Sequence, residues 1–244
     1  MVEIESAVQF SGSAQLKPVA PAVTGQLDYA ADHMVDHFTF LKQHAQKAIA
    51  AFARAGCTYL QLDEVYLAYL CDPKQHEELR SRSEDPDHLA QTYAKLINLA
   101  IAERSSDMTL AMHLCRGNFQ SSWIAEGGYE PVADLLFNAI DVDVYFMEYD
   151  TARAGGFEPL RFLPRDKMVV LGLVTSKTGD LENPDILKRR IDEALRYVSL
   201  DQLALSPQCG FASTEEGNLL SLEQQRAKLE LVVQVAQDVW GDAR

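Results

Sequence analysis

Five short apolar or β-branched runs, set among longer stretches with helical spacing, constrain the fold of this chain more than any other feature. The runs span residues 57–62, 108–112, 142–147, 168–174 and 202–206. Each is nearly continuous in apolar character, which is typical of strands buried on both faces of a parallel sheet. The helical stretches are 45–55, 87–104, 131–140, 184–198 and 222–240. This alternation, with no internal linker, predicts one α/β domain over residues 1–244.

The first 44 residues have no such pattern. Two prolines and a glycine fall within LKPVAPAVTG at 16–25, and the next stretch has no clean period. We therefore expect residues 1–44 to form an irregular N-terminal segment, in which 19–23 is the candidate for a sixth strand, and residues 45–244 to form βα units. Because a (β/α)8 barrel needs eight strands to close, the sequence predicts either an open sheet or a TIM-type barrel that is incomplete at its N-terminal side.

The charge balance excludes several classes of protein. The 36 acidic residues outnumber the 22 basic ones, for a net charge of -14. A general phosphate-binding surface for nucleic acid is therefore not expected, because affinity there comes from clustered Lys and Arg. No apolar run reaches the roughly 18 residues that span a bilayer, and MVEIESAVQF has acids where a signal peptide would be basic. These features predict a cytoplasmic protein with no nucleic-acid or membrane partner, whose four cysteines are thiols.

Polar residues follow almost every predicted strand. The carboxyl ends of parallel strands emerge on one side of a sheet, and ligands bind there. We therefore expect these residues to converge on one mouth, although they are far apart in the chain. They are Asp63, Glu64, His113, Cys115, Glu148, Ser176, Lys177 and Cys209.

The chemistry of this set points to a metal. His113 and Cys115 are two residues apart, so an extended strand would point both to one side. Cys209 supplies a second sulfur and Glu148 a carboxylate, and such donors suit a borderline-soft cation such as zinc. The H-x-C pair alone is a weak motif, and the bland alternatives are core packing for the cysteines and a salt bridge for Glu148. No G-x-S-x-G, P-loop or G-x-G-x-x-G occurs.

Five separated motifs carry a family resemblance. They are YLQLDE (59–64), HLCRGN (113–118), FMEYD (146–150), LGLVTSKTGDLE (171–182) and LSPQCGF (205–211). In this order they resemble the cobalamin-independent methionine synthases, and more closely the short homologues of the catalytic C-terminal half of that enzyme. The resemblance runs from about residue 18 to 241.

The resemblance implies a TIM barrel that carries a catalytic zinc. By matching motifs, His113, Cys115, Glu148 and Cys209 would be the zinc ligands. Asp63 would be the catalytic and substrate-binding residue, at the place where the family binds the amino group of homocysteine, with Glu64 beside it. The implied reaction moves a methyl group from 5-methyltetrahydrofolate to the thiol of homocysteine, forming methionine.

Three departures from the family pattern leave alternatives open. The family's first strands have no counterpart, the stretch between Phe40 and Ala45 is too short for a further strand with a folate contact, and Lys177 stands where full-length synthases place a histidine. One alternative is a related thiol alkyltransferase. A second is a degenerate, non-catalytic zinc-binding barrel that covers its strand edges as a homo-oligomer. A third is an open α/β enzyme without zinc that uses Asp63 and Glu64 as acid and base.

Overall fold

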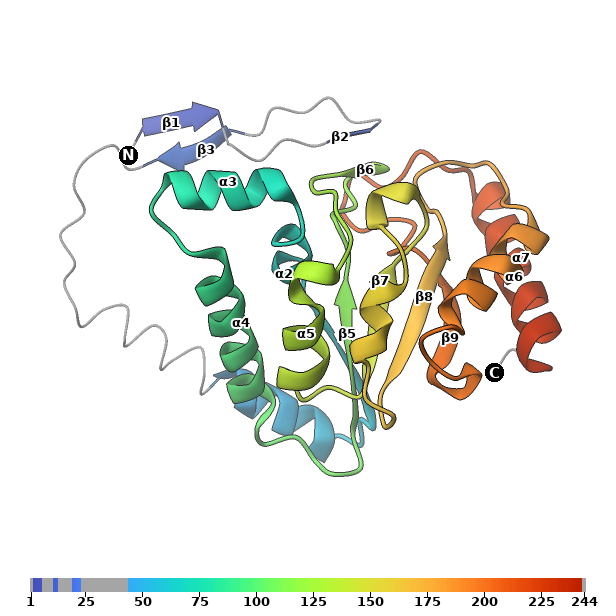
Figure 1. Ribbon diagram of the computed structural model, residues 1–244, viewed down its shortest axis with the longest axis horizontal. Helices are drawn as coiled ribbons and strands as arrows, with labels where there is room; N and C mark the ends of the chain where they lie inside the picture. The colour runs from blue at the N-terminus through green and yellow to red at the C-terminus, as the bar shows by residue number, and fades with distance from the viewer. Residues whose placement is uncertain (1, 6–10, 13–18, 23–43, 243–244) are drawn as a thin grey trace.

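A five-stranded parallel sheet forms the centre of the computed structural model, which describes residues 2–5, 11–12, 19–22 and 44–242 (Figure 1). All neighbouring strands are parallel, and the five strands stand in the sheet in the same order as along the chain. This sequential order is that of a barrel, whereas a doubly wound sheet reverses direction at a switch point. The strands are β4 (Tyr59–Asp63), β5 (Thr109–Leu114), β7 (Val144–Glu148), β8 (Met168–Val174) and β9 (Leu203–Pro207).

These strands confirm the five predicted runs, with small shifts at the ends. Four of them begin and end one or two residues later than the apolar runs, and β8 has the predicted bounds. As a result, Asp63 and Glu148 are the last residues of their strands, and His113 lies within β5. The shift matters for the site, because a side chain inside a strand has its direction fixed by the pleat.

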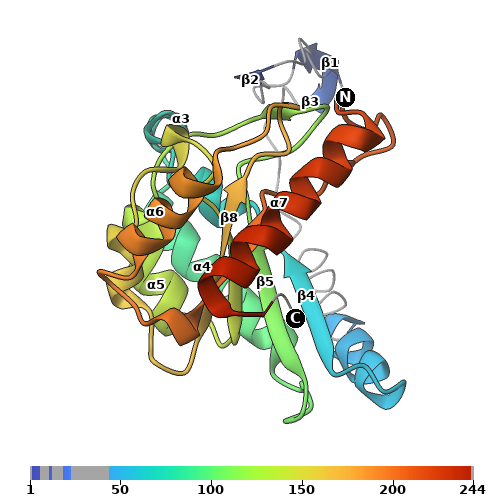
Figure 2. The same ribbon diagram turned by 90° about the vertical axis from the view of Figure 1, so that its right-hand side faces the viewer.

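The predicted helices are also present. Residues 44–54 are helical, and α4 (Pro86–Ile101), α5 (Ala133–Ala139), α6 (Pro184–Ala194) and α7 (Leu222–Trp240) follow. Figure 2 shows α4, α5 and α6 together on one side of the strands. Two further helices, α2 (Tyr66–Tyr69) and α3 (Pro73–Ser81), lie between β4 and α4. The segment AYLCDP (68–73) predicts that a short helix ends near Cys71, and α2 ends just before it. Helix α3 was not predicted, because it buries no residue and has no apolar stripe to reveal it.

Local sequence signals explain where the helices begin. Asp72, Asp85 and Asn183 each precede a proline, and each side chain accepts a hydrogen bond from a backbone N–H of the first turn of α3, α4 or α6. Proline fits the first turn because that N–H has no partner within the helix. At α7, Ser221 and Gln224 form a reciprocal capping box.

Alternation along the strands separates a packed face from a concave face. On β5, Leu110, Met112 and Leu114 are fully buried in the core. Residues of the opposite parity, such as His113, lie on the other face, away from the side on which α4, α5 and α6 pack (Figure 2). On the edge strand β4, Tyr59 remains 48% exposed on that face. The functional residues therefore lie on the inner face of an open sheet.

The sheet does not close in the described part of the chain. Its edge strands are β4 and β9, which do not pair with each other. The candidate sixth strand does form, as β3 (Val19–Ala22), but it pairs with β1 (Val2–Glu5) in a separate antiparallel sheet. A two-residue strand, β2 (Ser11–Gly12), pairs with β6 (Ser122–Trp123). The rest of the segment 1–43 lies outside the described residues, so the single domain over 1–244 stays a prediction.

None of the helices in the described ranges has the length and apolar character needed to cross a bilayer. The cytoplasmic location stays a prediction.

Candidate metal centre

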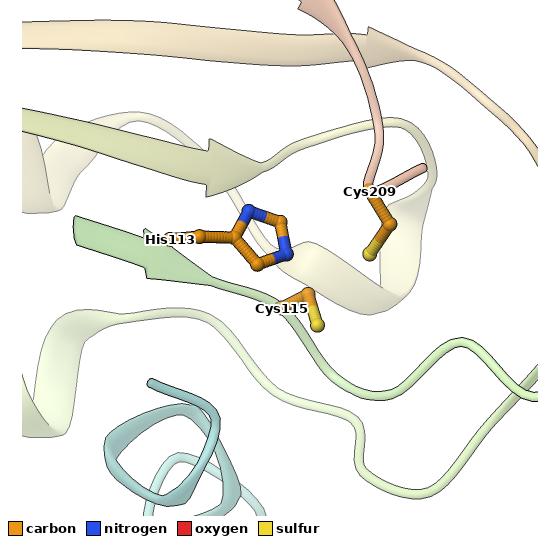
Figure 3. Close-up of side chains that lie close together, drawn as sticks. All are labelled: His113, Cys115 and Cys209. Carbon is orange, nitrogen blue, oxygen red and sulfur yellow. The ribbon is translucent and has the colours of Figure 1, made fainter. Parts of the chain in front are cut away.

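His113, Cys115 and Cys209 meet at the carboxyl ends of the strands. His113 is on β5, Cys115 directly follows β5, and Cys209 lies two residues beyond β9. The ligand atoms of the three side chains all lie within 4.8 Å of one another. Figure 3 shows the imidazole ring and the two sulfur atoms facing a common space. The predicted convergence of His113, Cys115 and Cys209 is therefore present in the structure.

The backbone at Cys209 is strained. Its φ of +51° lies in the left-handed region, which residues other than glycine seldom occupy. The neighbouring Gln208 is tied to β8, because its N–H donates to the carbonyl of Val174 at 2.7 Å. Strain of this kind persists only where surrounding contacts enforce it, and it is common at functional sites.

The three side chains shift one another's pKa values. A hydrogen bond from the Cys209 thiol lowers the pKa of Cys115 to about 5, helped by His113 and opposed by burial. Burial, together with that same hydrogen bond, raises the pKa of Cys209. Burial acts to lower the pKa of His113, but the hydrogen bond to Cys115 and the negative charges of Cys115, Asp63 and Glu148 together raise it above its ordinary value. The arrangement thus stabilises negative charge on a sulfur atom beside a second thiol and an imidazole.

This donor set fits a zinc ion. One nitrogen and two sulfur atoms at mutual ligand spacing match the ligands that zinc takes in tetrahedral sites. Hard cations such as Mg²⁺ and Ca²⁺ prefer oxygen and would gain little from thiolates. Three protein ligands of this type would leave a position for a further ligand, as catalytic zinc sites require.

Glu148, the fourth predicted ligand, lies in the same pocket with both oxygens engaged by protein groups. Its Oε1 accepts from Nε of Arg153 at 2.9 Å. Its Oε2 accepts from the backbone N–H of Arg116 and from Nε2 of Gln208, each at 2.9 Å. Glu148 is not part of the three-residue cluster in this arrangement, so its role as a ligand stays a prediction.

A pocket of about 610 Å³ opens beside the cluster on the concave face of the sheet. Asp63 lines it together with His113, Cys115, Glu148 and Cys209. Asp63 pairs in register with His113 on the neighbouring strand. Its carboxylate makes no hydrogen bond or ion pair with any other residue in the described ranges, and it is therefore available to a ligand.

Glu64 has a different placement. Its carboxylate accepts hydrogen bonds from the backbone N–H groups of Tyr66 and Leu67 at 3.0 and 2.9 Å, which caps the start of α2. Its own N–H donates to the carbonyl of His113 at 2.9 Å. Burial raises the pKa of this carboxyl group. These contacts give Glu64 a structural role, and its predicted role in substrate binding draws no support from them.

Lys177 is a cross-link between loops. Its Nζ donates to the carbonyl oxygens of Gly117 and Ser122 at 2.7 and 3.1 Å, and to Oδ1 of Asn118 at 2.9 Å. An ammonium group has three N–H donors, and all three are used here. Asn118 in turn donates to the carbonyl of Gly210 at 2.8 Å and to Oγ of Ser213 at 2.7 Å. The loops after β5, β8 and β9 are thereby tied together around the cluster.

Gln208, Arg153, Arg116 and Asn118 were not singled out in the sequence. Gln208 donates from Nε2 to Sγ of Cys209 at 2.6 Å as well as to Glu148, and so connects two predicted ligands. Arg153 forms ion pairs with Glu148 and Asp150 at 2.8 and 2.9 Å. Arg116 is fully buried. Gln208, Arg116 and Asn118 lie within the strand-end motifs LSPQCGF and HLCRGN, and that position was the signal that could have revealed them.

We expect Asn118→Ala to weaken zinc binding by about 10-fold, because loss of groups that orient metal ligands costs roughly 10–100-fold in affinity. The variant would break the link between the loops that carry Cys115 and Cys209. Competition with a zinc chelator of known affinity measures the change. Asn138→Ala, which removes an asparagine bonded to Asp134 and Phe162, is the matched control and should bind zinc normally. Equal affinity in the two variants would refute the orienting role.

Comparisons with known proteins identify the family of this chain. A family model described as the catalytic domain of cobalamin-independent synthase matches residues 33–238. Two Bacillus subtilis (strain 168) proteins, YxjG and YxjH, both described as uncharacterized, are 59% and 53% identical over 196 and 210 residues. These matches cover 80% and 86% of this chain but only 52% and 56% of the relatives, so the chain spans about half their length.

Solved structures give the same picture. A Listeria monocytogenes protein assigned as a vitamin B12-independent methionine synthase is 38% identical with a TM-score of 0.64, covering 86% of this chain and 57% of that one. A B12-independent methionine synthase from Shewanella sp. W3-18-1, in complex with selenomethionine, shares the fold at 19% identity and a TM-score of 0.61, with the same coverage. The predicted TIM-type barrel, incomplete at its N-terminal side, is confirmed, and the chain belongs to the family of cobalamin-independent methionine synthase catalytic domains.

Proposed function

We propose that this chain is a zinc-dependent methyltransferase that moves a methyl group from 5-methyltetrahydrofolate, or a related donor, to the thiol of homocysteine, forming methionine. The observation that carries the proposal is the cluster of one imidazole and two thiols beside the pocket. This cluster lies within the part of the chain that matches the family model.

The chain's own residues would hold the acceptor. His113, Cys115 and Cys209 would bind the zinc ion, and Glu148, whose oxygens accept from Arg153 and Gln208, would be the further ligand. Asp63, whose carboxylate lines the pocket and has no partner among the described residues, would pair with the ammonium group of homocysteine. Contact of the substrate thiol with the metal and of its ammonium group with Asp63 would together fix the approach of the sulfur atom to the methyl donor.

Zinc, when bound, lowers the pKa of a coordinated thiol so that the thiolate is the nucleophile. In the overall reaction a bond forms between sulfur and the methyl carbon, and the bond between that carbon and the folate nitrogen breaks. The thiol proton replaces the methyl group on the folate. Lys177 has no N–H left for this proton transfer, because its three donors are bound to the loop after β5.

The decisive experiment is addition of homocysteine to protein loaded with Co²⁺, which reports its ligands by visible absorption. We expect the sulfur-to-cobalt band to strengthen as the substrate thiolate joins the site. With zinc-loaded protein and methylated folate, methionine should then form. A cobalt spectrum that ignores millimolar homocysteine would contradict the proposal.

A second candidate is a non-catalytic zinc-binding barrel that acts as an oligomer. The observation that favours it is the open sheet, whose edge strands β4 and β9 have no partner among the described strands on their outer sides. Exposed edges are normally covered. In this case zinc would bind, homocysteine would leave the metal spectrum unchanged, and light scattering would give a mass above that of one chain.

A further inference from the structure

Arg153 is a buried guanidinium that is shared between two buried carboxylates beside the candidate metal centre. Its Nε donates to Oε1 of Glu148 at 2.9 Å, and its Nη2 lies 2.8 Å from that same oxygen. Nη2 also donates to both carboxylate oxygens of Asp150, at 2.9 and 3.0 Å. The side chains of Glu148 and Asp150 are fully buried, and that of Arg153 is only 9% exposed. Charged hydrogen bonds are strong when they are shielded from water in this way, so the three groups hold one another in place.

The aromatic ring of Trp123 stacks on the guanidinium of Arg153. Cζ of Arg153 lies 4.6 Å from the ring centre, within the roughly 6 Å over which an aromatic ring attracts a cation. The indole N–H donates to Oε1 of Glu126 at 3.0 Å, which fixes the orientation of the ring. The strand that carries Trp123, β6, is itself held by its pairing with β2 and by the bond from Lys177 to the carbonyl of Ser122. Trp123 is therefore a firm support for Arg153.

The two carboxylate oxygens of Glu148 are held by different parts of the protein. Oε1 is bound by Arg153, whereas Oε2 accepts from the backbone N–H of Arg116 and from Nε2 of Gln208, each at 2.9 Å. The same Nε2 donates to Sγ of Cys209 at 2.6 Å. One amide nitrogen thus connects Oε2 to a sulfur atom of the metal cluster. Oε2 is therefore the oxygen on the side of the cluster, and Oε1 is the oxygen on the side of Arg153.

From this arrangement we infer that Arg153 is a positioning residue for the metal centre. It holds Oε1 of Glu148 so that Oε2 is presented to a metal ion bound by the cluster of one imidazole and two thiols. Asp150 and Trp123 in turn hold Arg153. Groups that hydrogen-bond to metal ligands in this way commonly raise metal affinity by about 10–100-fold. The inference rests on the metal centre of the proposed function, and it does not depend on the identity of the methyl donor or acceptor.

Titration of Co²⁺ into variants of the full chain tests the inference. Arg153→Lys keeps the positive charge but loses the planar group that reaches two carboxylates and stacks on a ring. We expect its dissociation constant for Co²⁺ to rise about 10-fold, and its visible d–d bands to shift toward those of Glu148→Ala, which lacks the carboxylate. Arg161→Lys is the matched control, because Arg161 also stacks on a ring, that of Phe162, and pairs with a carboxylate, that of Glu130, at an exposed site. This control should bind Co²⁺ like the unmodified protein.

A double variant shows whether Arg153 acts through Glu148. We expect Arg153→Lys to change the Co²⁺ affinity by less than about 2-fold in the Glu148→Ala background, because the effects of two residues that act through each other are not additive.

Two substitutions of Trp123 test the support behind Arg153. Trp123→Leu removes the ring and should weaken Co²⁺ binding by about 3-fold, the scale of one cation–π contact. Trp123→Phe keeps an aromatic ring at this position and should retain most of the affinity.

The outcomes separate this inference from the proposed function. Equal losses from Arg153→Lys with and without the Glu148 carboxylate would overturn the inference, because Arg153 would then support the fold and not the carboxylate. Unchanged Co²⁺ binding by Arg153→Lys would also overturn it, as would tighter binding, which would mean that Arg153 competes with the metal. If the unmodified protein binds no Co²⁺, the inference and the proposed function both fail. If the Arg153 variants behave as expected but homocysteine leaves the cobalt spectrum unchanged, the inference stands and the proposed function fails.

Discussion

Cys209→Ser is expected to reduce the zinc content of the purified protein from about one ion per chain to less than a tenth of that. Cys209 is one of three side chains whose ligand atoms lie within 4.8 Å of one another. Its removal leaves Cys115 and His113, which are neighbours on one strand end and cannot surround a metal ion by themselves. A serine hydroxyl is a poor replacement, because zinc prefers thiolate and imidazole.

The measurement is elemental mass spectrometry on untagged protein after zinc loading and removal of excess metal. Cys57→Ser is the matched control. Cys57 lies before β4, and its thiol contacts the carbonyl of Tyr59, so this variant should keep its zinc. Retention of zinc by Cys209→Ser would mean that the metal is bound elsewhere, and loss of zinc from both variants would point to damage to the fold.

The convergence of Cys209 with His113 and Cys115 could be predicted because it depends on one rule. Parallel strands have their carboxyl ends on the same side, so residues 96 positions apart, such as His113 and Cys209, meet once both strand assignments are right. Nearly continuous apolar runs made these assignments secure. The shift of one or two residues at the strand ends did not affect the result, because the cluster includes residues both within and beyond the strands.

The partners of Glu148 could not be predicted in the same way. Its carboxylate is bound by Arg153, by the backbone of Arg116 and by Gln208, which come from three different loops. Loop conformation has no period in the sequence, so these contacts depend on tertiary packing alone. The same holds for Lys177, whose three acceptors lie 55 to 60 residues away. The family resemblance predicted Lys177 close to the reacting groups. Only the structure shows that all three N–H groups of its ammonium donate hydrogen bonds to protein oxygens.

Residues 19–23 illustrate a different limit. Their β-propensity predicts a strand, and Val19–Ala22 is one. Propensity cannot say which strand is the partner, however, and here the partner is β1 rather than the central sheet. The count of strands predicted the open sheet more reliably, because five strands are fewer than the eight that close a barrel.

Lys228→Met is expected to lower the free energy of unfolding by about 3–5 kcal/mol, the usual cost of removing one partner of a buried ion pair. Lys228 lies on α7 and is fully buried. Its Nζ donates to the carbonyl of Asp180 and to both carboxylate oxygens of Glu182, which itself accepts from the N–H of Thr175 at the end of β8. The methionine would leave the Glu182 carboxylate, only 19% exposed, without its cation.

Chemical denaturation followed by circular dichroism measures this change in the free energy of unfolding. A second substitution tests whether the loss comes from the unpaired carboxylate of Glu182. Lys228→Met combined with Glu182→Gln removes the charge along with its partner and should recover most of the loss, because a buried pair replaced as a whole is often nearly neutral. Lys188→Met, which removes an exposed pair with Asp185 and Asp238, should cost no more than about 1 kcal/mol. If Lys228→Met is as mild as this control, the pair does not anchor α7. Recovery in the double variant, the expected result, would mean that the complete ion pair adds little net stability. The cost of Lys228→Met alone would then come from the unpaired Glu182 carboxylate, on the loop from Thr175 to Glu182 that also carries Lys177 beside the candidate metal centre.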